Sequence, residues 1–584
     1  MGASQSIQAL GVSPGIAIGR VKCLHRLAGN RPERRVVAPD EVDGELKRLA
    51  EALSQTREQI TGLRDVLRDR LDQAGAAIFD AHLLLVDDKS LLAAIDERIR
   101  KNRLCAEFAV FDAVEQFAAV FGEMPDEYLR ERAVDLRDVG NRIVSNLVDP
   151  GLDAGFEGRR IVVAPTLAPS DTVQLDRSKV LGLAVEIGSA TSHTAILARS
   201  LRIPAVVGIP QELLERLSAD DTMIIDGFSG KVIINPDERT REAYRLKAKT
   251  TGEFLEQLER DSSLRPESTD GFIVELVANV DAQASYAEAR AVGAHGVGLF
   301  RTEFMFVDPA NIPGEDEQFA IYRKLLIDAG DDPVTVRTMD IGGDKAFSAV
   351  FRTPEDNPFL GLRGIRFSLY ERPDLFRVQL RALMRAGVFG NLRVMLPMVT
   401  SVLEVEETRA IVSGLEDELR QRGIEFAPLS IGVMIETPAA ALLADKLAPI
   451  VDFFSIGSND LVQYTMAADR GNERVAYLYR PTHPSILRLV DLCVAAARRN
   501  NIYVGVCGQM AGEPATAALL MGLGVHELSM SPGSVALIRR VIRSLSRHEA
   551  AQTARAAMEC RNASEAMALV QELLERRVPE LAAL

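Results

Sequence analysis

Eight short apolar segments in the second half of the chain alternate with stretches of helical periodicity, and no other feature constrains the fold as much. The segments are rich in β-branched residues and are bounded by Gly, Pro, Asn or Asp, as strands are. In chain order they read FIVELVANV, GVGLFRTEF, VTVRTMDIGG, LRVMLPMV, SIGVMIETP, VDFFSIGSND, IYVGVCGQM and HELSMSP. Eight strand–helix units in about 300 residues predict a (β/α)8 barrel over residues 265–584.

Several polar residues fall at or just past the C-terminal ends of these predicted strands. Barrel enzymes build their sites on that face. The residues are Arg301, Arg337, Glu436, Asn459, Asp460 and Cys507. For any one of them a structural role is the simpler interpretation, but the whole set on one face predicts a functional site.

The arginines indicate the charge of the ligand. Arg301 and Arg337 offer planar donor forks that match a phosphate or a carboxylate, and Arg363 and Arg470 could join them. The predicted substrate is therefore an anion.

Two carboxylates and a thiol complete the predicted barrel mouth. Glu436 and Asp460 could hold a hard divalent cation, which beside a phosphate is usually Mg2+, although either alone could equally be a salt-bridge partner. Cys507 follows a predicted strand and precedes a glycine, so its thiol should point into the mouth. Its spacing leaves open whether it is an inert buried cysteine or a proton donor.

A second candidate site lies in the segment GSATSHTAILARS. His193 follows a predicted strand and begins a predicted helix that Ser192 or Thr191 could cap, so an anion there would meet free backbone N–H groups. Most single histidines are structural, yet imidazole can accept a phosphoryl group near neutral pH. Thr194 and Arg199 would then hold the transferred oxygens.

The first half of the chain combines strand-like runs with one long helical stretch. Residues 36–148 contain few glycines or prolines and have apolar residues at three- and four-residue intervals, which predicts a helical bundle. The bundle interrupts an α/β domain formed by residues 1–35 and 149–235. A charged segment at 236–264 is typical of a solvated linker helix.

Composition excludes some classes of function. A net charge of -15 disfavours binding to nucleic acids, which attract basic surfaces. No apolar run approaches the length of a membrane span, and the start lacks a secretion signal, so we expect a soluble cytoplasmic protein. The five cysteines are scattered and form no CxxC pair, which argues against a disulfide framework or a zinc cluster.

Long motifs throughout the chain resemble enzyme I of the bacterial sugar phosphotransferase system, a family of phosphoenolpyruvate-utilising enzymes. They include SPGIAIG, TSHTAILARSLRIPAVVG, GVGLFRTEF, VRTMDIGGDK, NPFLGLRGIR, MIETPAA and FFSIGSNDLVQYTMAADRGN. The resemblance implies an α/β multidomain fold: a swivelling phosphohistidine domain with an inserted bundle, then a barrel. It also implies transfer of a phosphoryl group from phosphoenolpyruvate to a histidine and then to the carrier protein HPr, with release of pyruvate.

The resemblance implies a role for each candidate residue. His193 would be phosphorylated, and Cys507 would donate a proton to the enolate. Glu436 and Asp460 would bind Mg2+. The bundle would dock HPr, and the barrel would form a homodimer. The positions that would bind phosphoenolpyruvate are Arg301, Arg337, Arg363, Asn459 and Arg470.

The chain departs from the family pattern at a few positions. Ser189 and Ala190 stand where the family commonly has Gly-Arg before the histidine motif, so a nearby positive charge is missing. Gln509 and Met510 replace Glu-Leu after the cysteine motif. In the bundle, Lys89 interrupts an acidic run, which bears on the choice of carrier.

Three rival interpretations differ in what they require. Dikinase and synthase relatives that share the histidine domain and barrel need a nucleotide-binding domain, and the bundle offers no glycine-rich phosphate loop. A nitrogen-regulatory paralogue usually has an additional N-terminal sensory domain, so its absence favours the sugar system. A non-enzymatic scaffold would not be expected to retain His193, Arg301, Glu436, Asp460 and Cys507.

Overall fold

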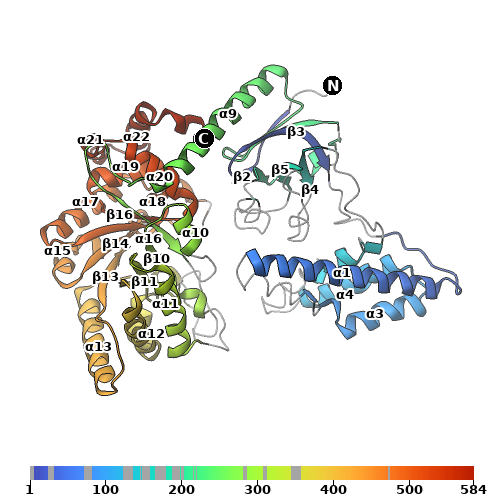
Figure 1. Cartoon of the computed structure of the whole chain (residues 1–584), viewed down its shortest axis with the longest axis horizontal. Helices are drawn as coiled ribbons and strands as arrows, with labels where there is room; N and C mark the ends of the chain where they lie inside the picture. Colours follow the sequence, from blue (N-terminus) through green and yellow to red (C-terminus); the bar gives the residue numbers. More distant parts are fainter. Residues whose placement is uncertain are drawn as a thin grey trace. The chain divides into compact units, whose positions relative to one another are not determined.

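A computed structural model gives two compact units, one that ends at Glu253 and one that begins at Phe254 (Figure 1). The α/β multidomain fold predicted from the sequence is confirmed, with a sheet and helices in the first unit and a closed barrel in the second. The structure describes residues 5–23, 32–70, 82–83, 85–122, 136–137, 139–144, 146–147, 158–164, 179–186, 198, 203–214, 216–218, 220–280, 286–306, 312–342, 355, 357–470, 472 and 474–583.

The first unit contains an eight-stranded sheet with the strand order β1-β8-β7-β3-β4-β5-β6-β2. Strands β3 to β6 run parallel, and the others pair antiparallel. Nearly every side chain of β4, β5 and β6 is buried, which explains their uninterrupted β-branched sequences. The strands are β1 (Gln5–Gln8), β2 (Leu10–Ser13), β3 (Ile16–Cys23), β4 (Arg160–Ala164), β5 (Val180–Val185), β6 (Ala205–Val207), β7 (Thr222–Asp226) and β8 (Lys231–Ile234).

Three helices of the predicted bundle are described: α1 (Val42–Arg70), α3 (Lys89–Arg100) and α4 (Ala106–Gly122). Their apolar faces form a core of their own. Glu45 of α1 accepts hydrogen bonds from Arg48 and from the amide of Ala106, each at 2.8 Å. Because that amide belongs to the first turn of α4, the carboxylate also interacts favourably with the helix dipole. This contact ties α1 to α4.

Helix α9 (Glu238–Arg260) follows the sheet and spans the division between the two units. The side chain of Asp237 accepts from the amide of Thr240 and begins the helix. Lys247 donates to the buried carboxylate of Asp226, at the end of β7, over 2.8 Å. Burial opposes ionisation of Asp226, but the hydrogen bonds from Lys247 and Ser229 outweigh it and lower its pKa. One ion pair thus holds the linker helix against the sheet.

The second unit is a closed barrel of eight parallel strands, and each strand predicted from the sequence is confirmed (Figure 1). The strands are β9 (Glu275–Val280), β10 (Val297–Phe300), β11 (Val334–Arg337), β12 (Leu392–Leu396), β13 (Ser430–Ile435), β14 (Phe453–Gly457), β15 (Tyr503–Cys507) and β16 (Glu527–Met530). Leu299, Met395, Met434, Phe453 and Cys507 form one apolar cluster among these strands. The strands therefore enclose packed side chains and no pore.

Helices follow the barrel strands and cover them with their apolar faces. The main ones are α11 (Glu315–Ala329), α12 (Pro373–Ala386), α13 (Val402–Gln421), α17 (Pro484–Arg499), α19 (Pro514–Leu523) and α20 (Pro532–Ser544). Shorter ones are α10 (Tyr286–Ala291), α14 (Pro438–Leu442), α15 (Ala444–Leu447), α16 (Ser458–Met466) and α18 (Gln509–Gly512). After α20 come α21 (Arg547–Met558), α22 (Ala563–Arg577) and a 3-10 helix (Pro579–Ala583). No helix in the described ranges is both long and apolar enough to cross a membrane.

We predict that Lys247→Met destabilises the first unit. The change leaves the Asp226 carboxylate buried without its cation, so the free energy of unfolding should fall by about 1–3 kcal/mol. The pKa of Asp226 is lowered in the folded state, so its ionised carboxylate stabilises the fold at pH values above the unfolded-state pKa. This stabilisation is lost as the pH falls through the folded-state pKa, and Lys247→Met should remove part of it at neutral pH. Hydrogen exchange of β7 and β8 at pH 7 measures it.

The matched control for this prediction is Lys249→Met on the same helix. Lys249 pairs with Glu253 at 3.9 Å, and both side chains are largely exposed. A surface pair of this kind contributes at most about 0.5 kcal/mol. Equal protection losses in the two variants would contradict the role assigned to Lys247.

Candidate active site

The residues predicted from the sequence lie where the barrel strands end. Arg337 is the last residue of β11, and Cys507 is the last residue of β15. Glu436 comes directly after β13. Asn459 and Asp460 lie in the first turn of α16, immediately after β14. Parallel strands end at one face of a barrel, so these side chains share the same rim.

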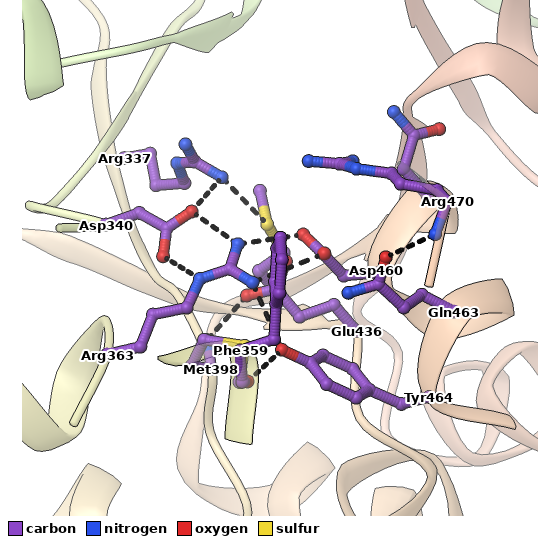
Figure 2. Close-up of polar contacts among 12 residues, drawn as sticks. Arg337, Asp340, Phe359, Arg363, Met398, Glu436, Asp460, Gln463, Tyr464 and Arg470 are labelled. Atoms are coloured by element: carbon purple, nitrogen blue, oxygen red, sulfur yellow. Dashed lines mark hydrogen bonds and ion pairs between the residues drawn. The ribbon is translucent and has the colours of Figure 1, made fainter. Parts of the chain in front are cut away.

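Arg363 forms the centre of a buried ion-pair cluster (Figure 2). Its Nε and Nη2 donate to the two oxygens of Asp340, both at 3.0 Å. Its Nη1 and Nη2 also donate to Asp460, at 3.3 and 3.0 Å. Arg363 and Asp340 are buried, so water does not screen these contacts. The arginine is fixed between two carboxylates.

Arg337, at the end of β11, is also held by buried carboxylates. Its Nη1 lies 3.0 Å from Oδ2 of Asp340, and its Nη2 pairs with Glu303, in a turn after β10. Both guanidinium groups therefore meet the same Asp340 carboxylate. Burial works against the charge of each arginine, but the adjacent carboxylates outweigh it and raise both pKa values.

The cluster contains more carboxylates than arginines. Glu303, Asp340, Glu436 and Asp460 are buried together with Arg337 and Arg363. Burial raises the pKa of Glu436 above its ordinary value, and the negative charges of Asp460 and Asp340 add to the effect. Burial and these like charges disfavour the ionised form of Glu436, and a cation bound beside the carboxylates would stabilise it.

Local backbone geometry fixes the Glu436 carboxylate. It accepts a hydrogen bond from the amide of Met398 at 2.5 Å. Met398 has a φ of 57°, a left-handed conformation that is uncommon outside glycine and often marks functional sites. The next residue, Thr437, donates to the carbonyl of Val399 and caps α14 through Ala440. The ends of β12 and β13 are thus joined at the carboxylate.

Cys507 is buried at the end of β15, beside Ser455 of β14. The Ser455 hydroxyl donates to its sulfur over 3.2 Å. Burial raises the pKa of the thiol to about 11, although the hydrogen bond from Ser455 works in the opposite direction. Gly508 follows with a φ of +150°, and a Cβ there would lie 2.3 Å from the Ser458 hydroxyl. The raised pKa keeps the thiol protonated at neutral pH.

The other arginines predicted from the sequence are more open to solvent. Arg301 follows β10 directly and is exposed, and so is Arg470. The backbone amide of Arg470 donates to the side chain of Gln463 at 3.1 Å, which anchors the loop after α16 (Figure 2). The side chain of Asn459 accepts from the amide of Gln509 at 3.0 Å, linking the first turn of α16 to the residues after Cys507.

The structure adds three residues that the sequence analysis did not single out. Asp340 and Glu303 hold the two buried arginines, and Ser455 contacts the thiol. Asp340 and Glu303 lie two or three residues after Arg301 or Arg337 in motifs that were recognised. A carboxylate so close in sequence to an arginine at a strand end could have been predicted to pair with one of the arginines of the site. Ser455 lies inside an apolar strand, and no pattern in the sequence singles it out.

The second candidate site lies outside the described residues. It comprises His193, Thr194 and Arg199, with Thr191 and Ser192 before them and the departures Ser189 and Ala190. Strand β5 before it and β6 after it are both described and belong to the parallel part of the sheet.

Comparison with known proteins yields matches along nearly the whole chain. The N-terminal, mobile and PEP-binding domains of PEP-utilising enzymes match residues 8–132, 156–230 and 256–547. A phosphoenolpyruvate-protein phosphotransferase of Geobacillus stearothermophilus is 42% identical over 97% of this chain and 98% of its own. Proteins of the same name from Enterococcus faecalis and Listeria monocytogenes are 40% and 41% identical, each over 97% of this chain and 99% of theirs.

The chain belongs to the phosphoenolpyruvate-protein phosphotransferase family. The resemblance found in the motifs is therefore confirmed over the full length. In this member of the family, the buried arginine–carboxylate cluster lies within the segment that matches the PEP-binding domain.

We predict that Ser455→Ala makes the Cys507 thiolate harder to form. The hydroxyl stabilises the charged sulfur, so its loss should raise the pKa of Cys507 further above 11 and move the onset of alkylation to higher pH. Mass spectrometry after iodoacetamide treatment at a series of pH values measures each cysteine separately. Cys560, which is partly exposed and distant in sequence, is the internal control, and a downward shift at Cys507 would refute the prediction.

Proposed function

We propose that this chain transfers the phosphoryl group of phosphoenolpyruvate to its own His193, releases pyruvate, and passes the group to the carrier protein HPr, the first step of the sugar phosphotransferase system. The observation that carries the proposal is the buried cluster of Arg337 and Arg363 with its four carboxylates at the barrel rim. Family membership supplies the reaction class.

Phosphoenolpyruvate carries a phosphate and a carboxylate, and the barrel rim has arginines for both. Arg337 and Arg363 are fixed by ion pairs before substrate binds, so little entropy is lost in orienting them. Arg301 and Arg470 are exposed and can close on the ligand, and Asn459 adds an amide. The fixed arginines would bind phosphoenolpyruvate, which carries two or three negative charges, and the exposed arginines would enclose it.

Glu436 and Asp460 are the proposed Mg2+ ligands. The residues fit such an ion, since both carboxylates are buried, interact electrostatically and belong to a cluster with excess negative charge. Two protein carboxylates suffice, because Mg2+ keeps waters and phosphate oxygens as further ligands. Among the described residues, no group of three or more histidine, cysteine, aspartate or glutamate side chains that could hold a metal ion is found. When bound, the ion would offset negative charge on the substrate.

The reaction divides into phosphorus and proton chemistry. An imidazole nitrogen of His193 attacks phosphorus in line as the bond from phosphorus to the bridging oxygen breaks, and enolpyruvate leaves. The Cys507 thiol then gives its proton to the methylene carbon, forming pyruvate, and the thiolate regains a proton from solvent. Thr194 and Arg199 are proposed to hold the phosphoryl oxygens on His193.

The division of labour among domains follows from this chemistry. Residues 1–35 and 149–235 would carry His193, residues 36–148 would bind HPr, the linker at 236–264 would allow movement, and residues 265–584 would bind substrate and form a homodimer in the cytoplasm. Asp226 and Lys247, which join α9 to the sheet, support a linker that moves with the histidine domain.

We predict that His193→Ala abolishes labelling by 32P-phosphoenolpyruvate in the presence of Mg2+, with or without HPr, because the phosphoryl acceptor is lost. His295→Ala, at an exposed histidine of the barrel, is the matched control and should label like the wild type. Both variants should keep the wild-type melting temperature. Acid-labile, base-stable phosphate on the His193→Ala protein would refute the proposed acceptor.

A further inference from the structure

Asp340 occupies an unusual position among the carboxylates of the barrel rim. Its two oxygens receive both the Nε and an Nη of Arg363, and one of them also receives an Nη of Arg337. The side chain is completely buried. It therefore joins two guanidinium groups that come from different parts of the chain.

The backbone beside Asp340 is held by a buried hydrogen-bond network. The amide of Met339 donates to Gln379 of α12, at 3.1 Å. Gln379 donates in turn to the hydroxyls of Thr302 and Tyr322, and Thr302 donates to the carbonyl of Arg337 over 2.9 Å. Between Arg337 and Asp340, the carbonyl of Arg337 and the amide of Met339 are thus both hydrogen-bonded to buried side chains. These hydrogen bonds fix the backbone beside Asp340 and therefore the position of its carboxylate.

Arg363 divides its donors between two carboxylates. Asp340 takes Nε and Nη2, while Asp460 takes Nη1 and Nη2 at 3.3 and 3.0 Å. Asp460 is also one of the two proposed cation ligands. A cation and Arg363 therefore compete for the oxygens of Asp460, and the outcome depends on how strongly Asp340 retains the arginine.

We propose that Asp340 is a positioning residue: it sets the separation of Arg337 and Arg363, and it shares the charge of Arg363 with Asp460, so that a cation can displace the arginine from Asp460. This inference rests on the proposed function of Glu436 and Asp460 as cation ligands. Asp340 itself is not assigned to the cation or the substrate. Without its charge, the two buried arginines repel each other, and Arg363 is left with Asp460 as its only paired carboxylate among these contacts, which strengthens that pair against a cation.

Binding of Mn2+ to the full chain without phosphoenolpyruvate tests this inference, with free Mn2+ measured by electron paramagnetic resonance. Asp340→Asn should weaken binding about tenfold, the equivalent of one charge-assisted hydrogen bond. Glu303→Gln removes the same charge from the same cluster, but Glu303 pairs with Arg337. It should change the affinity by less than about threefold, since Arg363 keeps Asp340.

A double-mutant cycle identifies Arg363 as the intermediary. If Asp340 acts by sharing the charge of that arginine with Asp460, then Asp340→Asn should have no further effect on Mn2+ affinity in an Arg363→Met background. A loss that persists there, or an equal loss in Glu303→Gln, would reduce Asp340 to one negative charge among several and overturn the inference. If the wild type itself binds no Mn2+, the proposed cation site fails and the inference fails with it.

Asp340→Glu guards against a folding defect in the asparagine variant. It keeps the buried charge but lengthens the side chain by one methylene, so the two guanidinium groups cannot both keep their contacts. A several-fold weaker Mn2+ affinity is expected, measured at a temperature at which circular dichroism shows the variant to be folded. Wild-type affinity in this variant would overturn the geometric part of the inference.

Discussion

Two buried guanidinium groups facing an excess of buried carboxylates impose the main constraint on this barrel. Removing one partner from such a buried pair costs about 3–5 kcal/mol, so the cluster has to be balanced and held with accurate geometry. Arg337, Arg363, Asp340 and Asp460 come from segments as far apart as the ends of β11 and β14. In a closed barrel, all parallel strands end at one circular rim, so these residues can lie close together. In an open sheet, strands at opposite edges would be far apart.

Two residues near the strand ends adopt positive φ angles in this arrangement. Met398 adopts a left-handed conformation so that its amide reaches Glu436, and Gly508 has a φ at which a side chain would strike Ser458. Both residues directly follow or lie near strand ends. The hydrogen bond from the Met398 amide to Glu436 offsets the strain at Met398, whereas glycine adopts the φ at position 508 without strain. The proposed chemistry thus depends on the fixed positions of Arg337, Arg363 and Glu436 at the rim.

The sequence was sufficient for the parts of the fold that local pattern determines. All eight barrel strands could be predicted, because each is a short, largely apolar run that is followed by glycine, proline or a polar residue, and most of them are rich in β-branched residues. The placement of Glu436 and Cys507 on the rim followed from their position after such runs. Contacts among rim residues could not be predicted: nothing in the spacing of Arg363 says that it meets both Asp340 and Asp460, since that depends on loop paths after β11 and β14. The prediction for His193 concerns residues that the structure does not describe.

Separating the two half-reactions in a Glu436→Gln variant tests most directly the claim that the buried cluster performs the phosphoenolpyruvate chemistry and nothing else. Phosphorylation of His193 by phosphoenolpyruvate should slow by about 10²- to 10³-fold, since an electrostatic contribution to the transition state is removed. Phosphoryl exchange between HPr phosphate and His193 should proceed at the wild-type rate, because it makes no use of the barrel rim. An equal decline of both half-reactions would contradict the account.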